Sequence, residues 1–293
     1  MNILAVSLVL ISALFHSLRN IFTKQSVDKQ LFLWWYTVWG LIYFLPVFIY
    51  FMWQSGIPNL SVIGLCFFSG FLHFIYWVFL TKAYEFGDIS LTYPIMRSSP
   101  ALVFLIAVLF LNEKVSAGGV VGIIVVMCGI YFLSFGQIKF SKIQFLKLED
   151  FFKDRSIQYA LIGLVSITGY SIADKMIVEY INPILFVFLH MLFGFMCYSI
   201  YIYFRKKKYQ LTHEWKTNKT RILMAGFLGI YGYSLIIIAY TIERVSYIVG
   251  LRQLSIVFVV FWGGYYLNEK QKFNRLISAF VITGGVCLIS MLG

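Results

Sequence analysis

The chain is built largely from apolar runs that are each about long enough to cross a lipid bilayer. A membrane-spanning helix needs about 20 predominantly apolar residues, because its backbone polar groups have no water to pair with. Runs of approximately this length lie at residues 3–22, 32–53, 62–84, 89–111, 117–135, 157–178, 183–204, 222–241, 247–267 and 275–292. Only 12% of the residues are charged, against about 25% in a typical soluble domain. The sequence therefore predicts an all-α integral membrane protein with ten transmembrane helices.

The two halves of the chain share a pattern. Leu-Asn-Glu-Lys at residues 111–114 recurs at residues 267–270. Each half contains an odd number of helices, so two similar copies in one membrane must have opposite orientations. We predict two inverted five-helix repeats, residues 1–138 and 157–293, joined by a charged linker at residues 139–156.

Lysine and arginine are concentrated in the connections after the first, third, fifth, seventh and ninth runs. The positive-inside bias places these loops in the cytoplasm and both termini outside the cell membrane. The net charge of +12 is therefore interpreted as a sign of contact with the membrane surface rather than with nucleic acid. Within these connections, residues 205–221 are expected to form a surface loop and the linker an amphipathic interfacial helix.

Several short motifs together resemble a known module. The fourth run ends in Leu-Asn-Glu113-Lys and is followed by Gly118-Gly119-x-x-Gly122 and Gly129. The second half repeats this pattern with Asn268-Glu269-Lys270 and Gly284-Gly285. The arrangement resembles the EamA module of the drug/metabolite transporter superfamily and covers essentially the whole chain. The glycines are interpreted as positions of close helix packing.

The resemblance implies secondary transport of small metabolites through a central cavity lined by the first, third, fourth, sixth, eighth and ninth helices. It fixes neither the solute nor the direction of transport. The second copy departs from the family's common proline, because Gly250 stands where Pro94 stands.

Polar residues recur every four positions in the first run, at Ser12, His16 and Asn20, and in the sixth, at Ser166, Tyr170 and Asp174. This spacing places each set on one helical face. Because the two stripes match across the duplication, we expect them to line a cavity. The alternative is interhelical hydrogen bonding that holds the bundle together.

Two arginines lie inside apolar runs, Arg97 in the fourth and Arg252 in the ninth. A buried arginine is costly in hydrocarbon and normally faces a protein cavity. Two guanidinium forks can bind a carboxylate or phosphate group bidentately. Tyr93 lies one turn before Arg97, and Gln253 stands at the position equivalent to Arg97 in the second copy. Alternatively, each arginine pairs with a protein carboxylate or carbonyl, such as Asp174.

The third run carries Ser69, His73 and Trp77 on one face, and Tyr233 is equivalent to Trp77 in the second copy. Trp77 and Tyr233 can stack on a substrate ring or enclose a quaternary ammonium group. Packing and lipid-facing roles are the alternative for both. His190 is interpreted as an isolated packing residue.

Coupling to protons needs a titratable group in the pathway, and the candidates are Asp174, His16, His73 and Glu85. The sequence shows no nucleophile–base arrangement, metal-ligand spacing or phosphate-binding glycine loop. We therefore expect neither an enzyme nor a cofactor.

These features predict a secondary transporter that works by alternating access on a small polar organic metabolite with an anionic group, such as an amino acid, organic acid or phosphonate/phosphate ester. An alternative substrate is a cationic or quaternary amine or an aromatic drug-like compound. The non-transport alternatives are an integral-membrane enzyme and a scaffold. The expected partners are the solute and the lipid bilayer, with a coupling proton or counter-substrate in addition, and no nucleic acid.

Overall fold

The structure is a computed structural model that describes residues 1–86, 92, 95–135, 154–205, 208–259 and 273–293. Within these residues the chain forms no strand, and ten helices have defined bounds. The helices are α1 (Ile3–Lys24), α2 (Lys29–Ser55), α3 (Leu60–Phe86), α5 (Ser99–Phe110), α6 (Ala117–Phe135), α9 (Arg155–Ile177), α10 (Pro183–Arg205), α11 (Lys208–Ile242), α12 (Val245–Leu251) and α14 (Phe273–Leu292).

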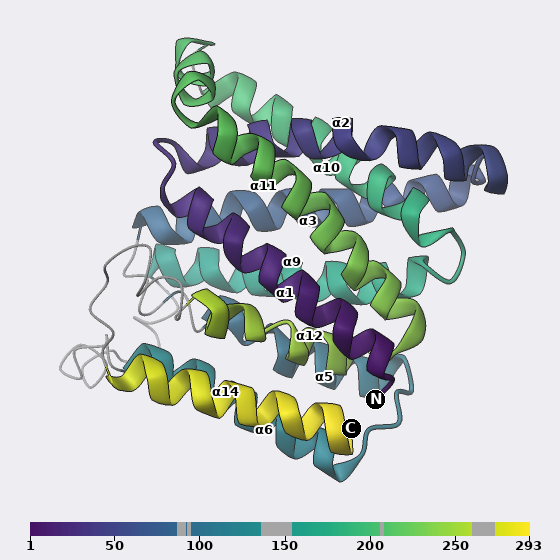
Figure 1. The fold of residues 1–293 in the computed structure, drawn as a ribbon, viewed down its shortest axis with the longest axis vertical. Helices are drawn as coiled ribbons and strands as arrows, with labels where there is room; N and C mark the ends of the chain where they lie inside the picture. Colours follow the sequence, from purple (N-terminus) through teal and green to yellow (C-terminus); the bar gives the residue numbers. More distant parts are fainter. Residues whose placement is uncertain (87–91, 93–94, 136–153, 206–207, 260–272) are drawn as a thin grey trace. The chain divides into compact units, whose positions relative to one another are not determined.

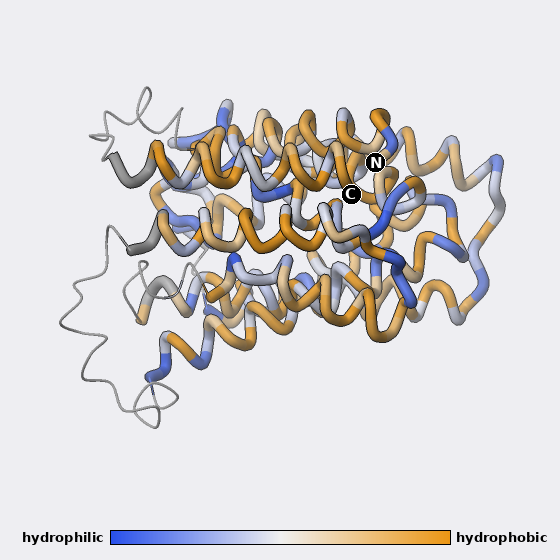
Figure 2. Tube along the Cα trace, turned by 90° about the horizontal axis from the view of Figure 1, so that it is seen from below, coloured by the Kyte–Doolittle hydropathy of each residue, from blue (hydrophilic) through white to orange (hydrophobic). Residues whose placement is uncertain are grey.

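Six of these helices are long and apolar enough to cross a membrane: α1, α2, α3, α9, α10 and α11. The shorter apolar helical stretches are Ile95–Phe110, Ala117–Phe132, Val245–Val259 and Leu276–Leu292. Hydrophobic residues predominate along the helices, and hydrophilic residues gather at several connections (Figure 2). The prediction of an all-helical, multi-pass membrane protein is confirmed.

The chain divides into two compact units, and each is described by itself. Unit 1 comprises Met1, Ile75–Ile172 and Arg244–Gly293, and unit 2 comprises Asn2–Phe74 and Ala173–Glu243. Each unit contains helices from both halves of the chain. The helices α3 and α9 contribute residues to both units.

Many helices begin at an Asn or Asp whose side chain caps the first turn. The capping residues are Asn2 for α1, Asp28 for α2, Asn59 for α3, Asp154 for α9 and Asn182 for α10. Each accepts a hydrogen bond from a backbone N–H that has no partner within its own helix. The Ser156 hydroxyl also donates to Asp154 and holds the pKa of this carboxyl below its ordinary value.

In unit 1, α6 and α14 pack side by side through glycines (Figure 1). A methyl group on Gly122 would lie 2.8 Å from the Gly285 carbonyl oxygen, and one on Gly285 would lie 2.7 Å from the Val126 nitrogen. Only a hydrogen fits at either position. The packing interpretation of these two glycines is confirmed.

In unit 2, α11 packs against α1 and α2 (Figure 1). A methyl group on Gly226 would lie 2.9 Å from the Tyr36 carbonyl oxygen, so α2 and α11 approach closely there. The Ser12 hydroxyl of α1 donates to the Gly232 carbonyl of α11 at 2.6 Å. For Ser12, the structure thus shows the bundle-holding hydrogen bond that was the alternative to cavity lining.

The prediction of a surface loop at residues 205–221 is wrong, because the chain is helical from Lys208 and changes direction at Asn218 (φ −119°, ψ 21°). The segment packs against the protein because it contains a buried carboxylate that needs hydrogen-bond donors. Glu214 accepts hydrogen bonds from the Asp28 backbone N–H and the Asn218 amide, both at 2.8 Å. The Trp35 indole donates to the Leu211 carbonyl at 3.0 Å. These contacts hold the helix against the start of α2.

Some predictions lie outside the described residues. They concern the body of the linker at residues 139–153, the side chain of Tyr93, and Glu269 with its motif. The backbone of Glu85 belongs to α3, but its side chain is also outside the described part.

We predict that Gly285→Ala destabilises the protein and that Gly284→Ala does not. The methyl group at residue 285 would collide with backbone atoms of α6, whereas at residue 284 no atom lies within 4 Å. Overpacking of this kind typically costs about 1–3 kcal/mol. The measurement is thermal unfolding of the two purified variants in detergent. Equal unfolding temperatures would contradict close α6–α14 packing.

Candidate functional site

Polar side chains surround Asp174 in the interior of unit 2. Asp174 lies near the C-terminal end of α9 and is fully buried. The Ser69 hydroxyl of α3 donates to Asp174 Oδ1 at 2.5 Å, and the Tyr233 hydroxyl of α11 donates to Asp174 Oδ2. His73 Nε2 lies 3.0 Å from the Tyr233 hydroxyl oxygen and 3.9 Å from Asp174 Oδ2. We refer to these four residues as the Asp174 cluster.

A carboxyl group inside a membrane-spanning helix is costly unless it is paired, and such groups usually serve a function. Here each Asp174 oxygen has its own hydroxyl donor. Asp174, His73 and Tyr233 were each predicted from the sequence as candidate site residues, on three different helices. The cluster brings these three side chains together. Ser69 joins them because it lies one turn before His73 on α3.

The hydrogen bonds of His73 define its tautomer. His73 Nδ1 lies 3.0 Å from the Ser69 backbone carbonyl oxygen. A carbonyl oxygen only accepts, so Nδ1 carries a proton. The other ring nitrogen, Nε2, therefore faces the Tyr233 hydroxyl either as the acceptor of a neutral ring or as a second donor.

His190 of α10 borders the Asp174 cluster. Its ring centroid lies 4.9 Å from that of His73 and 5.1 Å from that of Tyr233. Its Nδ1 donates to the Phe186 carbonyl at 3.0 Å. Gly70 permits this approach of α10 to α3, because a methyl group on Gly70 would lie 2.8 Å from the Gly194 nitrogen. The interpretation of His190 as isolated is therefore wrong. The sequence did not reveal these contacts, because no spacing pattern in α10 connects His190 to residues of the third run.

The polar residues of the α1 and α9 stripes make separate contacts, and a common cavity lined by them stays a prediction. His16 and Asn20 hydrogen bond to each other at 3.1 Å in unit 2. Ser166 donates to its own helix, to the Ile162 carbonyl at 2.7 Å. Tyr170 is buried in unit 1 with its ring 5.8 Å from that of Tyr76.

In unit 1, the helix that carries Arg97 is interrupted beside it. Ser98 N donates to the Ile95 carbonyl at 3.2 Å, and Ala101 N donates to the Ser98 carbonyl at 3.0 Å. These bonds span three residues rather than four, so α5 begins only at Ser99. Arg97 lies at the interruption and is partly buried. The predicted single helix over residues 89–111 is therefore divided.

The helix that carries Arg252 is interrupted in the same way. α12 ends at Leu251, and the chain turns at Arg252 and Gln253 before it becomes helical again. Gln253 N donates to the Gly250 carbonyl at 3.1 Å, and Ile256 N to the Gln253 carbonyl at 2.9 Å. The interruption forms here without a proline. Short stretches with this hydrogen bonding inside a helix often mark functional hinges.

Three buried polar groups of unit 1 have no hydrogen-bond partner within the described part of the chain. They are Ser99 Oγ, Thr168 Oγ1 and Gln253 Oε1. The Gln253 amide nitrogen, in contrast, donates to the Val249 carbonyl at 3.2 Å. A buried polar group without a partner costs about 1–3 kcal/mol. These groups retain the capacity to bind a polar ligand.

Glu113 connects the end of α5 to the start of α12 within unit 1. Its carboxylate accepts hydrogen bonds from Val245 N at 2.7 Å and from the Ser246 hydroxyl at 2.6 Å. Asn112 precedes it with φ 52°, a left-handed conformation that asparagine tolerates well. The Asn-Glu motif thus makes a turn and then caps a helix whose first N–H groups need an acceptor.

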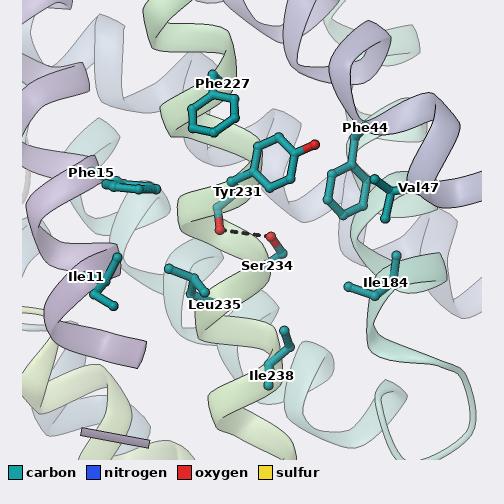
Figure 3. A pocket seen from close by; sticks show the side chains of 10 residues that line it. All are labelled: Ile11, Phe15, Phe44, Val47, Ile184, Phe227, Tyr231, Ser234, Leu235 and Ile238. Carbon is teal, nitrogen blue, oxygen red and sulfur yellow. Dashed lines mark hydrogen bonds between the residues drawn. The ribbon is translucent and has the colours of Figure 1, made fainter. Parts of the chain in front are cut away.

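An apolar groove of about 360 Å³ lies among α1, α2, α10 and α11 (Figure 3). Its lining residues are Ile11, Phe15, Phe44, Val47, Ile184, Phe227, Tyr231, Ser234, Leu235 and Ile238. The Ser234 hydroxyl donates to the Tyr231 carbonyl at 2.8 Å (Figure 3). The groove therefore offers few polar contacts to a polar solute.

The remaining predicted residues are distributed over the two units. Trp77 lies on α3 in unit 1, whereas His73, one turn earlier, lies in unit 2. Arg97, Arg252 and Gln253 belong to unit 1. Pairing of either arginine with Asp174 of unit 2 stays a prediction. Within the described ranges, no three His, Cys, Asp or Glu residues are grouped so that they could hold a metal ion.

The fold and these sites define a multi-pass membrane protein with polar side chains inside its helices. The chain belongs to the EamA-like transporter family, whose model matches residues 3–135 and 154–291. No curated protein sequence matches it significantly. A solved crystal structure of a protein is similar over 98% of this chain and 97% of its own, with a TM-score of 0.74 and 15% identity. At this identity, the likeness supports the fold alone.

We predict that Glu113→Ala lowers the thermal stability of the protein, because it leaves the first N–H groups of α12 without their acceptor. The loss should be about 1–3 kcal/mol. Glu179→Ala is the control, since Glu179 is exposed and its replacement changes the net charge equally. Thermal unfolding in detergent measures both variants. Equal stability of E113A and E179A would contradict the capping role.

Proposed function

We propose that the protein is a secondary transporter that moves a small polar organic metabolite with an anionic group across the cell membrane by alternating access. Membership of the EamA-like transporter family supports the class of activity. The observation that carries the choice of solute is the position of Arg97 and Arg252, each at an interrupted stretch of an apolar helix in unit 1.

A guanidinium group inside an apolar helix is costly, and it persists where it has a partner of opposite charge or a polar cavity. The forked geometry of arginine suits the two oxygens of a carboxylate or phosphate group. Interrupted helices commonly form the substrate sites of secondary transporters, because their irregular backbone faces a cavity. The buried Ser99, Thr168 and Gln253 side chains add hydrogen-bonding capacity in the same unit.

We further propose that the solute pathway includes the other predicted residues: Tyr93, Trp77 and Tyr170 with the arginines, and His16, Asn20, His73, Asp174 and Tyr233 of unit 2. The basic connections are proposed to face the cytoplasm, in accordance with the positive-inside bias. Partners of this activity are the solute and the lipid bilayer.

The test is a binding screen that measures thermal stabilisation of the purified protein by amino acids, organic acids, phosphate esters and quaternary amines. A ligand that binds only the folded state raises its stability by mass action. We expect an anionic compound to stabilise the wild type. Arg97→Gln and Arg252→Gln should each raise the Kd of this compound, obtained from the dependence of stabilisation on its concentration, by at least about tenfold, because a charge-assisted hydrogen bond is worth about 1.5–3 kcal/mol.

The control is Arg155→Gln, which removes an exposed arginine at the start of α9. Stabilisation by a quaternary amine that is equal in the wild type and R97Q would instead support an aromatic cage. Failure of reconstituted protein to exchange any stabilising compound across liposomes would overturn the transport function.

A further inference from the structure

We propose that Asp174, Tyr233 and His73 form a proton-binding site that holds one exchangeable proton, and that this proton is the coupling ion of transport. The coupling part of this proposal rests on the proposed transport function. The proton site itself rests only on hydrogen bonds within unit 2.

The number of protons follows from the donors and acceptors. The Tyr233 hydroxyl lies between two partners, Asp174 Oδ2 and His73 Nε2. A hydroxyl has one hydrogen, which can serve only one of these contacts. His73 Nδ1 cannot help, because its proton is directed to the Ser69 carbonyl. The second contact therefore needs one further proton, on Asp174 or on His73.

Two arrangements satisfy this count with the same positions of the heavy atoms. In the first, the carboxylic acid of Asp174 donates to Tyr233, and Tyr233 donates to a neutral His73. In the second, Tyr233 donates to the Asp174 carboxylate, and His73 Nε2–H donates to Tyr233. A shift of two protons along the chain of hydrogen bonds converts one into the other. Both arrangements have a net charge of zero, which burial favours.

Loss of the extra proton has a structural consequence. The three side chains would then carry one negative charge and a single hydrogen for two contacts. If that hydrogen serves Asp174, lone pairs of Tyr233 and His73 face each other at 3.0 Å. The His73–Tyr233 contact would open, and with it a link between α3 and α11. Proton release is thereby coupled to helix movement.

Other polar groups lie in and around the Asp174 cluster. Ser69 donates its hydrogen to Asp174 Oδ1. The Cys66 thiol, about one turn before Ser69, lies within electrostatic reach of Asp174. The His190 ring borders the cluster from α10. Lys175, next to Asp174, is directed to the Tyr240 and Glu243 carbonyls, at 2.5 and 3.3 Å.

On the remaining helices of unit 2, His16 of α1 is bonded to Asn20. Along α2, the only Lys, Arg, Asp or Glu is Lys29, at its first position. Also on α1, the Arg19 guanidinium lies over the Tyr36 ring. Asp174 and His73 are both buried, with 3.9 Å between His73 Nε2 and Asp174 Oδ2.

The position of the proton site in the chain favours a coupling role. His73 lies next to the last residue of α3 that belongs to unit 2, and Asp174 is the second residue of α9 that belongs to it. Each protonatable residue is thus near a point where the chain passes from one unit to the other. A rearrangement of their contacts acts directly on these connecting helices.

The first experiment counts protons without any solute. The purified full-length protein is titrated in weakly buffered detergent between about pH 5 and about pH 9, a range that includes the ordinary titration of histidine. We expect the wild type to bind about one more proton per chain than Asp174→Asn, because a buried His73 imidazolium lacks its counter-charge in this variant. Equal proton binding by both proteins would overturn the proposal.

If D174N does not fold, His73→Gln tests the same proton site. This variant removes one of the two positions of the proton, so the pH midpoint of proton release should move by at least about one unit. His213→Gln is the control, since His213 is exposed on α11. An unchanged midpoint in H73Q would contradict a shared proton.

The second experiment tests coupling with Tyr233→Phe, which removes the hydroxyl between Asp174 and His73. Proteoliposomes that contain a pH-sensitive dye are supplied with the compound that stabilises the protein best. Solute-dependent proton movement should fall by about 100-fold in Y233F. Tyr231→Phe, the same change on the same helix, should leave it unchanged.

The outcomes separate the two proposals. Loss of proton movement in Y233F but not in Y231F, at a solute concentration that saturates both variants, supports the coupling site. Solute exchange without any proton movement in the wild type overturns coupling but leaves the transport function intact. Absence of solute binding in the wild type overturns the transport function, while the proton count still decides whether the site exists.

Discussion

The structure depends on one constraint: a polar group surrounded by hydrocarbon must find its hydrogen-bond partner within the protein. This constraint explains the all-helical fold, and it also explains the helix ends. Asp28 and Asn182 each cap the first turn of the helix that follows. Glu113 does the same for α12 from a distant part of the sequence. Asp174 meets the constraint with one hydroxyl partner for each oxygen.

Glycines determine how closely these partners can approach one another. Gly122 and Gly285 bring α6 and α14 into backbone contact in unit 1, and Gly70 brings α3 close to α10 in unit 2. The two units then differ in what they hold. Unit 1 carries Arg97 and Arg252 at interrupted helices, and the proposed recognition of an anion rests on these two residues. Unit 2 carries the Asp174 cluster, on which the proposed proton site rests.

Much of this could be predicted from the sequence because membrane helices are defined by local composition. The four-residue spacing likewise marked Asp174 and His73 as polar positions inside apolar runs. The prediction of a loop at residues 205–221 was wrong, since one partner of the buried Glu214 is the backbone of Asp28, the distant residue that caps α2. His190 was missed for a related reason: its neighbours lie on α3 and α11, and no local period connects them.

The sequence by itself determined that this is a membrane protein of two related halves with arginines and a carboxyl group inside its spans. Runs of apolar residues and matching motifs are local properties, and a bilayer leaves the backbone little choice but helix. Only the tertiary structure decided which side chains meet. Hydrogen bonds between Ser69, Tyr233 and Asp174 need helices far apart in the chain to pack within a few ångströms, and that packing depends on every contact between them.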